Sequence, residues 1–468
     1  MEYQPFKIIV DENNAKGGMV SDFLKLNTQV LNSELEWFVK LLDTRLKLHF
    51  GHDCEYQDVY DIPCPTISPN NTSYAKFINY YQLSFEERVV LLLALIPHIK
   101  PQLLDVFYTK NAANDREFTE FGGRNGSVHQ GFLPTAQTAL FILAGENLEK
   151  RLRLLYLFHA DHVFQKYNIL NIDRSGDNEL DLNGVLHLSR DTLDMLTTGV
   201  IRKPNFGPEF PAKRIETALT WDDLVLDYYT MQHVLEIKAW IDFGDEMLYD
   251  LELGQKLKPG YRVLFHGPAG TGKTLTATLL GKVTERDVYR IDLSMVISKY
   301  IGETEKNLEK VFRQVEHKNW ILFFDEADAL FGKRTNISDA HDRFANQEVS
   351  YLLQRVEDYA GVVILASNMK SNLDEAFLRR FQSVIYFPMP EPNERYRLWQ
   401  NAFSIKTPLS DQINLKEIAA QFELSGGSIM NVVRYATLMA LRDKTRIITI
   451  GNLMDGIRKE FNKEGKSL

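Results

Sequence analysis

Gly267-Pro268-Ala269-Gly270-Thr271-Gly272-Lys273-Thr274 matches the GxxxxGK[ST] phosphate-loop pattern at every required position. Residues 262–265 before it predict a buried strand, and residues 274–282 after it predict a helix. In such a loop backbone N–H groups surround phosphate oxygens. Lys273 is then expected to reach the β- and γ-phosphates, and the Thr274 hydroxyl to ligate Mg²⁺. A glycine-rich turn with a chance lysine would not explain the flanking strand and helix. The stretch therefore predicts that the chain binds a nucleoside triphosphate.

Length and composition limit the other possibilities. The 468 residues are too many for one core, and 44% hydrophobic with 25% charged residues is typical of a globular protein. There is no run of about 18 uncharged apolar residues, so we expect no membrane span. Cys54 and Cys64 are too few for a disulfide framework, which predicts a reducing cytoplasm. The net charge of −9 argues against a nucleic-acid surface without excluding a local basic patch.

Residues 1–196 predict a mainly helical N-terminal region. Apolar periodicity predicts helices over 21–50, 85–96, 135–144 and 147–167, the second beginning at a capping box at Ser84 and ending at Pro97. Residues 178–188 alternate as strands do, with a hairpin turn at Asn183-Gly184, and Ser189 would cap a short helix. Helices followed by such a hairpin are compatible with a winged-helix module. Residues 197–220, rich in glycine and proline, predict a linker.

Polar residues follow two further apolar strands. Residues 320–324 lead into Asp325 and Glu326, and residues 362–367 lead into Asn368. We expect Asp325 to hold the Mg²⁺ shell, Glu326 to polarise the water that attacks the γ-phosphate, and Asn368 to position that water. Arg379 and Arg380 end a predicted helix, where they would stabilise charge on the phosphoryl group of a neighbouring subunit. The alternative is a solvated arginine pair at a helix C-terminus.

Together these motifs resemble a single AAA+ module of the AAA branch, the branch of katanin-like and proteasomal ATPases, over residues 221–463. Three more segments carry the resemblance: 221–225 beside adenine, 298–306 as the first pore loop, and 425–429 at the start of the lid. It implies a P-loop α/β domain over 221–388 and a helical lid over 389–468. The residues implied to bind nucleotide are Asp223, Val225, Gly267, Pro268, Ala269, Gly270, Thr271, Gly272, Lys273, Thr274, Leu275, Gly426 and Gly427.

The resemblance also implies an activity. It implies hydrolysis of ATP with Mg²⁺, assembly into a homo-oligomeric ring, usually a hexamer, and a protein substrate gripped by a pore loop of Lys299, Tyr300 and Ile301. The sequence Leu378-Arg379-Arg380-Phe381 lacks the Pro-Gly spacer of many relatives, so which arginine acts in trans stays open.

Two alternatives compete with a protein remodeller. One is an ATPase that acts on nucleic acid through the winged helix, and the other is a scaffold that binds ATP without hydrolysing it. Residues 86–97 and 121–123 resemble bacterial AAA ATPases encoded with extracellular contractile injection systems, which implies a role with a phage-tail-like particle.

Overall fold

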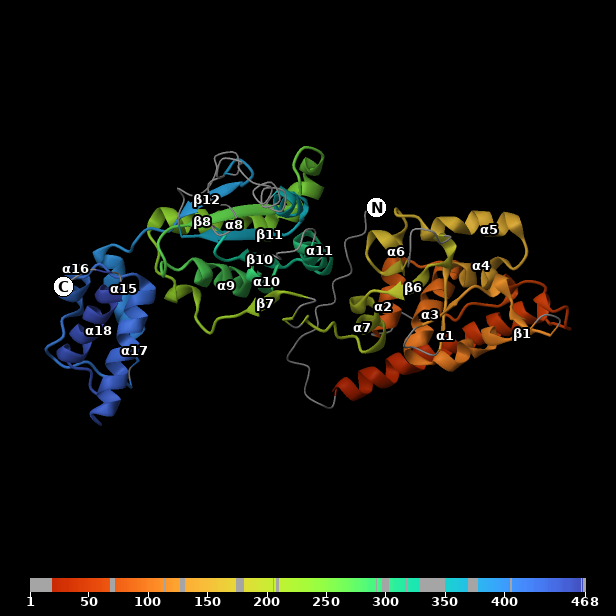
Figure 1. Cartoon of the computed structure of the whole chain (residues 1–468), viewed down its shortest axis with the longest axis horizontal. Coiled ribbons are helices and arrows are strands. Elements are labelled where there is room, and N and C mark those ends of the chain that lie inside the picture. The colour runs from red at the N-terminus through yellow and green to blue at the C-terminus, as the bar shows by residue number, and fades with distance from the viewer. Residues whose placement is uncertain are drawn as a thin grey trace. The chain divides into compact units, whose positions relative to one another are not determined.

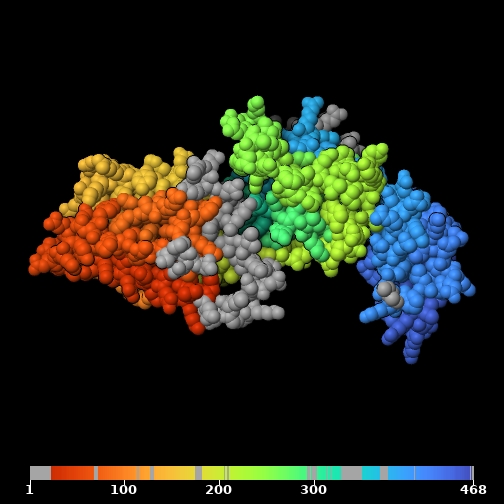
Figure 2. Space-filling view, turned by 180° about the vertical axis from the view of Figure 1, so that it is seen from behind, coloured from red at the N-terminus to blue at the C-terminus, as the bar shows by residue number. Residues whose placement is uncertain are grey.

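The chain divides into two compact units, residues 1–203 and 204–468. The structure is a computed structural model. It describes residues 19–67, 72–112, 115–126, 131–173, 181–204, 206–207, 210–291, 293–296, 303–316, 318–327, 350–368, 378–404, 406–463 and 465. In the space-filling view the first unit runs from red to yellow and the second from green to blue (Figure 2). The division falls inside the segment predicted as a linker.

The first unit is a helical domain around one apolar core (Figure 1). Its central helix is α3, where every residue from Val89 to Ile96 is buried. The predicted capping box at Ser84 is present, but the helix does not end at Pro97: it continues to Ile99, with the proline in its last turn, where the hydrogen-bond ladder is interrupted only near its end. The α-helices are α1 (Met19–His49), α2 (Ser73–Tyr81), α3 (Phe85–Ile99), α4 (Ala136–Ala144), α5 (Leu148–Leu154), α6 (Val163–Lys166) and α7 (Arg190–Thr197). The 3-10 helices are η2 (Val59–Asp61), η3 (Pro101–Tyr108), η4 (Thr119–Phe121), η5 (Leu155–Phe158) and η6 (Asp181–Asn183).

Two sequence predictions for this unit are wrong in detail. The helix expected over 147–167 is three pieces, because the His162 side chain caps a new helix at α6. The expected hairpin turn at Asn183-Gly184 is also wrong. Strand β6 (Val185–Leu188) pairs instead with β5 (Leu170–Asp173), and residues 181–183 form η6. A Cβ on Gly184 would lie 2.1 Å from Cγ2 of Ile172, so this glycine permits close approach of the two segments. The other strand pairs of the unit are β1 (Lys110–Asn111) with β2 (Arg116–Glu117), and β3 (Arg124–Asn125) with β4 (Phe132–Leu133).

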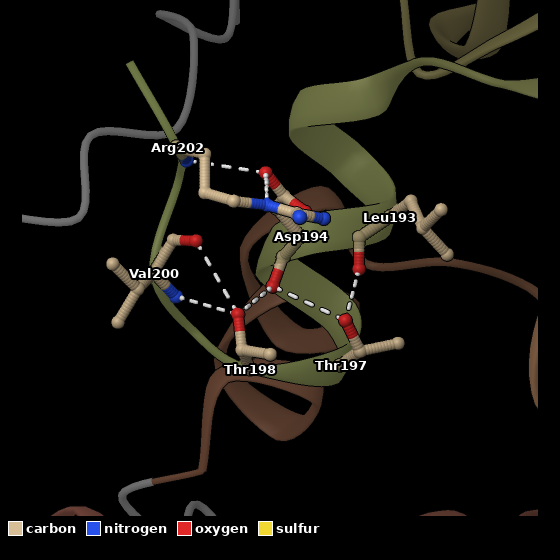
Figure 3. A network of polar contacts seen from close by, with 6 residues as sticks. All are labelled: Leu193, Asp194, Thr197, Thr198, Val200 and Arg202. Carbon is tan, nitrogen blue, oxygen red and sulfur yellow. Dashed lines mark hydrogen bonds and ion pairs between the residues drawn. The ribbon is translucent and has the colours of Figure 1, made fainter.

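The last segment of the first unit is fastened by one buried carboxylate (Figure 3). The side chain of Asp194, on α7, is 1% exposed. It accepts hydrogen bonds from the backbone N–H of Arg202 at 3.1 Å and from Nη2 of Arg202 at 2.6 Å. The Thr198 hydroxyl bridges the carbonyl oxygens of Asp194 and Val200, which turns the chain after α7. Residues 198–202 therefore fold back onto the helix that precedes them.

The second unit contains a six-stranded sheet in the order β12-β8-β11-β10-β9-β7. Five strands are parallel, and β7 is antiparallel to β9 at one edge. β7 lies in the segment predicted as a linker, so part of that segment belongs to the sheet. The strands are β7 (Ala212–Ile215), β8 (Tyr261–His266), β9 (Val288–Ile291), β10 (Ile321–Phe324), β11 (Val362–Ser367) and β12 (Ser383–Tyr386).

Both faces of this sheet are apolar. Alternate side chains of a strand point to opposite faces, and successive residues of the central strands are apolar and buried. Val263 and Phe265 of β8 pack with α8 (Tyr228–Asp245) and α9 (Lys273–Val283) on one face, while Leu264 packs with α11 (Glu303–Val315) and the helix over 350–358 on the other. Figure 1 shows helices on both sides of the sheet. This arrangement explains why the parallel strands are continuous apolar runs in the sequence. The helices here are α8 (Tyr228–Asp245), α9 (Lys273–Val283), α10 (Leu293–Val296) and α11 (Glu303–Val315), with shorter turns η7 (Trp221–Asp223), η8 (Glu246–Asp250) and η9 (Leu253–Gln255).

The end of the chain forms a small helical bundle with its own core around Trp399 (blue in Figure 1). Four helices were predicted over 394–403, 415–422, 428–442 and 451–461. The structure has α15 (Pro392–Ala402), α16 (Leu415–Gln421), α17 (Gly426–Arg442) and α18 (Ile450–Lys463), so each predicted helix is present within two residues at either end.

Among the described residues, no single helix has the length and apolar character needed to cross a membrane. One bent pair, α3 with η3, passes that test together, on length and composition alone.

Candidate nucleotide-binding site

The phosphate loop joins β8 to α9 and requires glycine at three positions. Gly267, Gly270 and Gly272 have φ values of 144°, 78° and 104°, which side chains with a Cβ rarely adopt. At Gly267 a Cβ would also lie 2.1 Å from the carbonyl oxygen of Phe387. The loop leads directly into α9, so the unpaired N–H groups at the start of that helix face the same place. Backbone geometry alone therefore builds an anion site here.

Lys273 is held against the loop from which it comes. Its side chain is buried, with 8% of the residue exposed. Its Nζ donates to the carbonyl oxygens of Gly267 and Pro268, at 2.7 and 2.9 Å, and to Oδ1 of Asn368 at 3.2 Å. The last contact joins two predicted site residues that are 95 positions apart in sequence. The ammonium group thus lies beside the loop. Phosphate oxygens bound there would take the place of the carbonyl and amide oxygens that now accept its hydrogen bonds.

The acidic pair follows β10 at the same edge of the sheet. Because β11 separates β8 from β10, the strand order places Asn368 between the phosphate loop and the two acids. Asp325 is half-buried and Glu326 is exposed. The Glu326 backbone has φ of 52°, and its N–H donates to Oδ1 of Asp325 at 3.1 Å. Directly after the pair, the N–H of Ala327 donates to the carbonyl oxygen of Ala366, which ties this turn to β11.

This donor set suits a nucleotide with Mg²⁺. Thr274 at the start of α9 and Asp325 at the end of β10 supply a hydroxyl and a carboxylate, the oxygen ligands that Mg²⁺ prefers. The Glu326 carboxylate is exposed and is not consumed in an ion pair among the described residues, so it remains available to orient water.

The lid contacts the phosphate loop through two glycines. Gly426 and Gly427 begin α17, and the N–H of Gly427 donates to the carbonyl oxygen of Gly270 at 3.0 Å. A Cβ on Gly270 would lie 2.5 Å from Oγ of Ser425, the residue that caps α17. The start of the lid therefore closes against the loop without a side chain between the two backbones.

The segment around Asp223 and Val225 also lies beside the loop. Methyl carbons of Leu224 and Leu226 are 3.9 Å from the position of a Cβ on Gly272, and Val225 is buried. The Asp223 carboxylate accepts from the backbone N–H of Thr220 at 2.7 Å, and that hydrogen bond lowers the pKa of Asp223. Asp223 thus caps its own turn.

The paired arginines lie away from this edge. Arg379 and Arg380 are exposed and come just before β12. Two residues after Arg380, Gln382 donates its N–H to the carbonyl oxygen of Arg262, which lies near the start of β8. The phosphate loop, in contrast, follows the end of β8. The structure therefore separates the two arginines from the site of their own chain by the length of a strand. Lys299, Tyr300 and Ile301 lie outside the described residues.

The sequence predicts no role for three residues around the arginine pair. Glu357 forms an ion pair with Arg380, while Arg262 and Gln382 hydrogen-bond to each other. The sequence predicts Arg262 only as part of a buried strand. Its charge was the one available hint, because a buried parallel strand seldom carries an arginine.

Comparison with known proteins agrees with this geometry. Residues 263–389 match the ATPase family associated with various cellular activities (AAA). The chain is 31% identical over 231 residues to the cell division cycle protein 48 homolog of Archaeoglobus fulgidus, covering 48% of this chain and 31% of that protein. It is 33% identical over 216 residues to the proteasome-activating nucleotidase of Aeropyrum pernix, covering 44% and 52%. It is 32% identical over 228 residues to the probable 26S proteasome regulatory subunit 4 of Caenorhabditis elegans, covering 47% and 51%. The chain thus spans about half the length, or less, of these curated relatives.

Proposed function

We propose that this chain, which contains an AAA ATPase domain, hydrolyses ATP with Mg²⁺ as part of a homo-oligomeric ring that remodels proteins. The observation that carries the proposal is the hydrogen bond from Nζ of Lys273 to Oδ1 of Asn368. It lies at the carboxyl ends of the parallel strands, where Asp325 and Glu326 also lie. A loop that only binds phosphate needs no exposed carboxylate two strands away. A site that hydrolyses ATP needs such a carboxylate, because the attacking water must be oriented.

Each residue then has one role. The N–H groups of residues 267–274 and the Lys273 ammonium bind the phosphates and offset negative charge on the transferring group. Thr274 and Asp325 would hold Mg²⁺, which would offset negative charge on the phosphates. Glu326 orients and polarises the water, and the Asn368 amide, fixed by Lys273, holds that water in line. We propose ATP rather than GTP from the resemblance and from the match to an ATPase family.

The position of the arginine pair supports an oligomer. β8 has six residues, so the two ends of this strand are roughly 17–20 Å apart. Arg379 and Arg380 cannot span that length to their own phosphate loop, but a neighbouring copy can bring its loop to them. A guanidinium that completes a neighbour's site makes hydrolysis depend on assembly. The hexamer is the form we propose, following the resemblance.

A protein substrate is proposed from two sources. Relatives are named as proteasome-activating nucleotidase and proteasome regulatory subunit, and the segment over 299–301 resembles a pore loop. We propose that Tyr300 grips an extended polypeptide and that the first unit selects the target, in a reducing cytoplasm. A narrower proposal, service to a contractile injection system, is supported only by the N-terminal pattern over 86–97 and 121–123.

Nucleic acid is the alternative substrate. It was based partly on a winged helix over 178–198, but the hairpin expected at Asn183-Gly184 is absent from the described residues. That result and the net charge of −9 favour a protein target. Stimulation of ATP hydrolysis by DNA that disappears with added salt would favour the alternative.

The testing experiment compares wild type with Glu326→Gln. We expect the variant to bind ATP, to lose turnover and to accumulate as an oligomer near six subunits, measured by phosphate release and light scattering. Wild-type turnover in this variant would refute the role of Glu326. A chain that stays monomeric with ATP yet hydrolyses it at the same specific rate at every protein concentration would refute the oligomer.

A further inference from the structure

Arg262 is a buried arginine at the start of β8, on the strand that leads to the phosphate loop. Only 5% of the residue is exposed. Its N–H and Nε–H both donate to Oε1 of Gln382, at 2.8 and 3.2 Å, and its Nη1–H donates to the carbonyl oxygen of Glu357 at 2.8 Å. In the opposite direction, the backbone N–H of Gln382 donates to the carbonyl oxygen of Arg262 at 3.0 Å. Four hydrogen bonds therefore join one strand residue to the end of a helix and to the turn after the arginine pair.

A buried guanidinium is costly, so its presence needs a reason. Burial lowers the pKa of Arg262, and the carboxylates of Glu357 and Asp358 oppose that effect. A valine or isoleucine would serve the strand equally well and would avoid the desolvation. Neither could reach the helix end at Glu357 and the turn at Gln382 together. The simplest alternative is that Arg262 only satisfies a carbonyl group at the end of the helix over 350–358.

The two arginines of the turn differ in their surroundings. Nη1 of Arg380 forms an ion pair with Oε1 of Glu357 at 2.6 Å. Arg379 is exposed and forms no ion pair with the residues that the structure describes. The same glutamate thus receives Arg380 on its side chain and Arg262 on its backbone. Within this turn Arg380 is held by its ion pair with Glu357, whereas the Arg379 side chain is exposed.

We propose that Arg262 is a positioning residue: through Gln382 and Glu357 it holds the turn over 378–382, so that Arg379 is presented to the nucleotide of a neighbouring copy while Arg380 stays paired within its own copy. The inference depends on the proposed function, since it requires a neighbour with bound ATP. It answers which arginine acts in trans, and it identifies a connection from the start of β8 to the adjoining subunit.

The first test separates the two arginines by steady-state ATP hydrolysis. Arg379→Ala should lower kcat by about 10³-fold or more, the usual value of an arginine that acts in trans. Arg380→Ala and Glu357→Gln should each lower it by less than about 5-fold, because an exposed ion pair contributes little. Equal large losses at Arg379 and Arg380 would overturn the division of roles.

The second test examines Arg262 through its partner. Gln382→Ala removes an acceptor from an exposed side chain, and Arg262→Lys keeps the charge but cannot reach both partners. Each should lower kcat by about 10- to 100-fold while KM for ATP changes less than about 2-fold, since a small misplacement of a catalytic group costs rate and not substrate binding. Gln400→Ala, at an exposed glutamine of the lid helix α15, is the matched control and should behave as wild type.

Mixed oligomers separate positioning in trans from a local structural role. A Lys273→Ala subunit has a defective site but intact arginines, so mixing it with Arg379→Ala, Gln382→Ala or Arg262→Lys subunits should restore hydrolysis at the sites of the latter. If mixing rescues Arg379→Ala but not the other two, Arg262 supports only its own strand and the inference is wrong, while the proposed function stands. If Arg379→Ala keeps wild-type activity, the trans-arginine mechanism and this inference both fail.

Discussion

Replacing Glu326 by glycine should leave the second unit more stable than replacing it by alanine, although both changes should abolish hydrolysis. Glu326 has φ of 52°, a left-handed conformation that costs a residue with a Cβ about 1–2 kcal/mol. Glycine adopts this conformation freely but loses about 0.5–1 kcal/mol more backbone entropy on folding than alanine. The difference predicts that Glu326→Gly is about 0.5–1 kcal/mol more stable than Glu326→Ala. For a domain of this size that is about 1–4 °C in Tm.

Comparison with Glu326→Ala is essential, because both variants remove the carboxylate and its repulsion by Asp325. Calorimetry of the full chain gives the Tm of the second unit. Glu417, in α16, supplies the control: its backbone is helical, so Glu417→Gly should be less stable than Glu417→Ala by about 1 kcal/mol, the opposite sign. That pair also identifies which calorimetric transition belongs to the second unit. If Glu326→Gly is no more stable than Glu326→Ala, strain at this residue is refuted.

Three further predictions follow from single contacts. Lys273→Ala should weaken ATP binding by about 10- to 100-fold, because a charge-assisted contact to phosphate is lost, as a fluorescent ATP analogue would report; unchanged affinity would contradict its role. Gly267→Ala should lose ATP binding yet keep the fold by circular dichroism, since its Cβ would lie 2.1 Å from the Phe387 carbonyl oxygen; normal binding would show that the loop can shift. Asp194→Asn should destabilise the first unit by about 1–2 kcal/mol in urea at neutral pH. Burial disfavours the Asp194 carboxylate, but hydrogen bonds from Arg202 outweigh it and lower its pKa, so the wild-type advantage should be complete above about pH 4 and should shrink as the pH falls further; an advantage that does not shrink below about pH 4 would refute this account.

Local pattern was sufficient for much of the second unit. The phosphate loop, the apolar strands before Asp325 and Asn368, and the lid helices each depend on residues close in sequence, because turn geometry, capping and side-chain periodicity are local properties. The meeting of Lys273 and Asn368 could be anticipated as well, since the carboxyl ends of adjacent parallel strands share one edge of the sheet.

Local pattern failed where pairing joined distant segments. The sequence predicts that β6 pairs across Asn183-Gly184, but its partner is β5, whose Leu170 is buried with Leu186 and Leu188 of β6, and no turn signal reveals that pairing. Strand β7, in a segment with the composition of a linker, completes the sheet because β9 has an open edge.

The sequence by itself determined that a nucleotide site exists and which residues build its phosphate loop. Only the tertiary structure decided that Arg379 and Arg380 lie near the opposite end of the strands from the phosphate loop, and that Arg262 contacts Gln382 and Glu357 beside them. The reason is physical: the conformation of a loop is set by its own glycines, whereas the burial of a charge is determined by partners about 100 residues away.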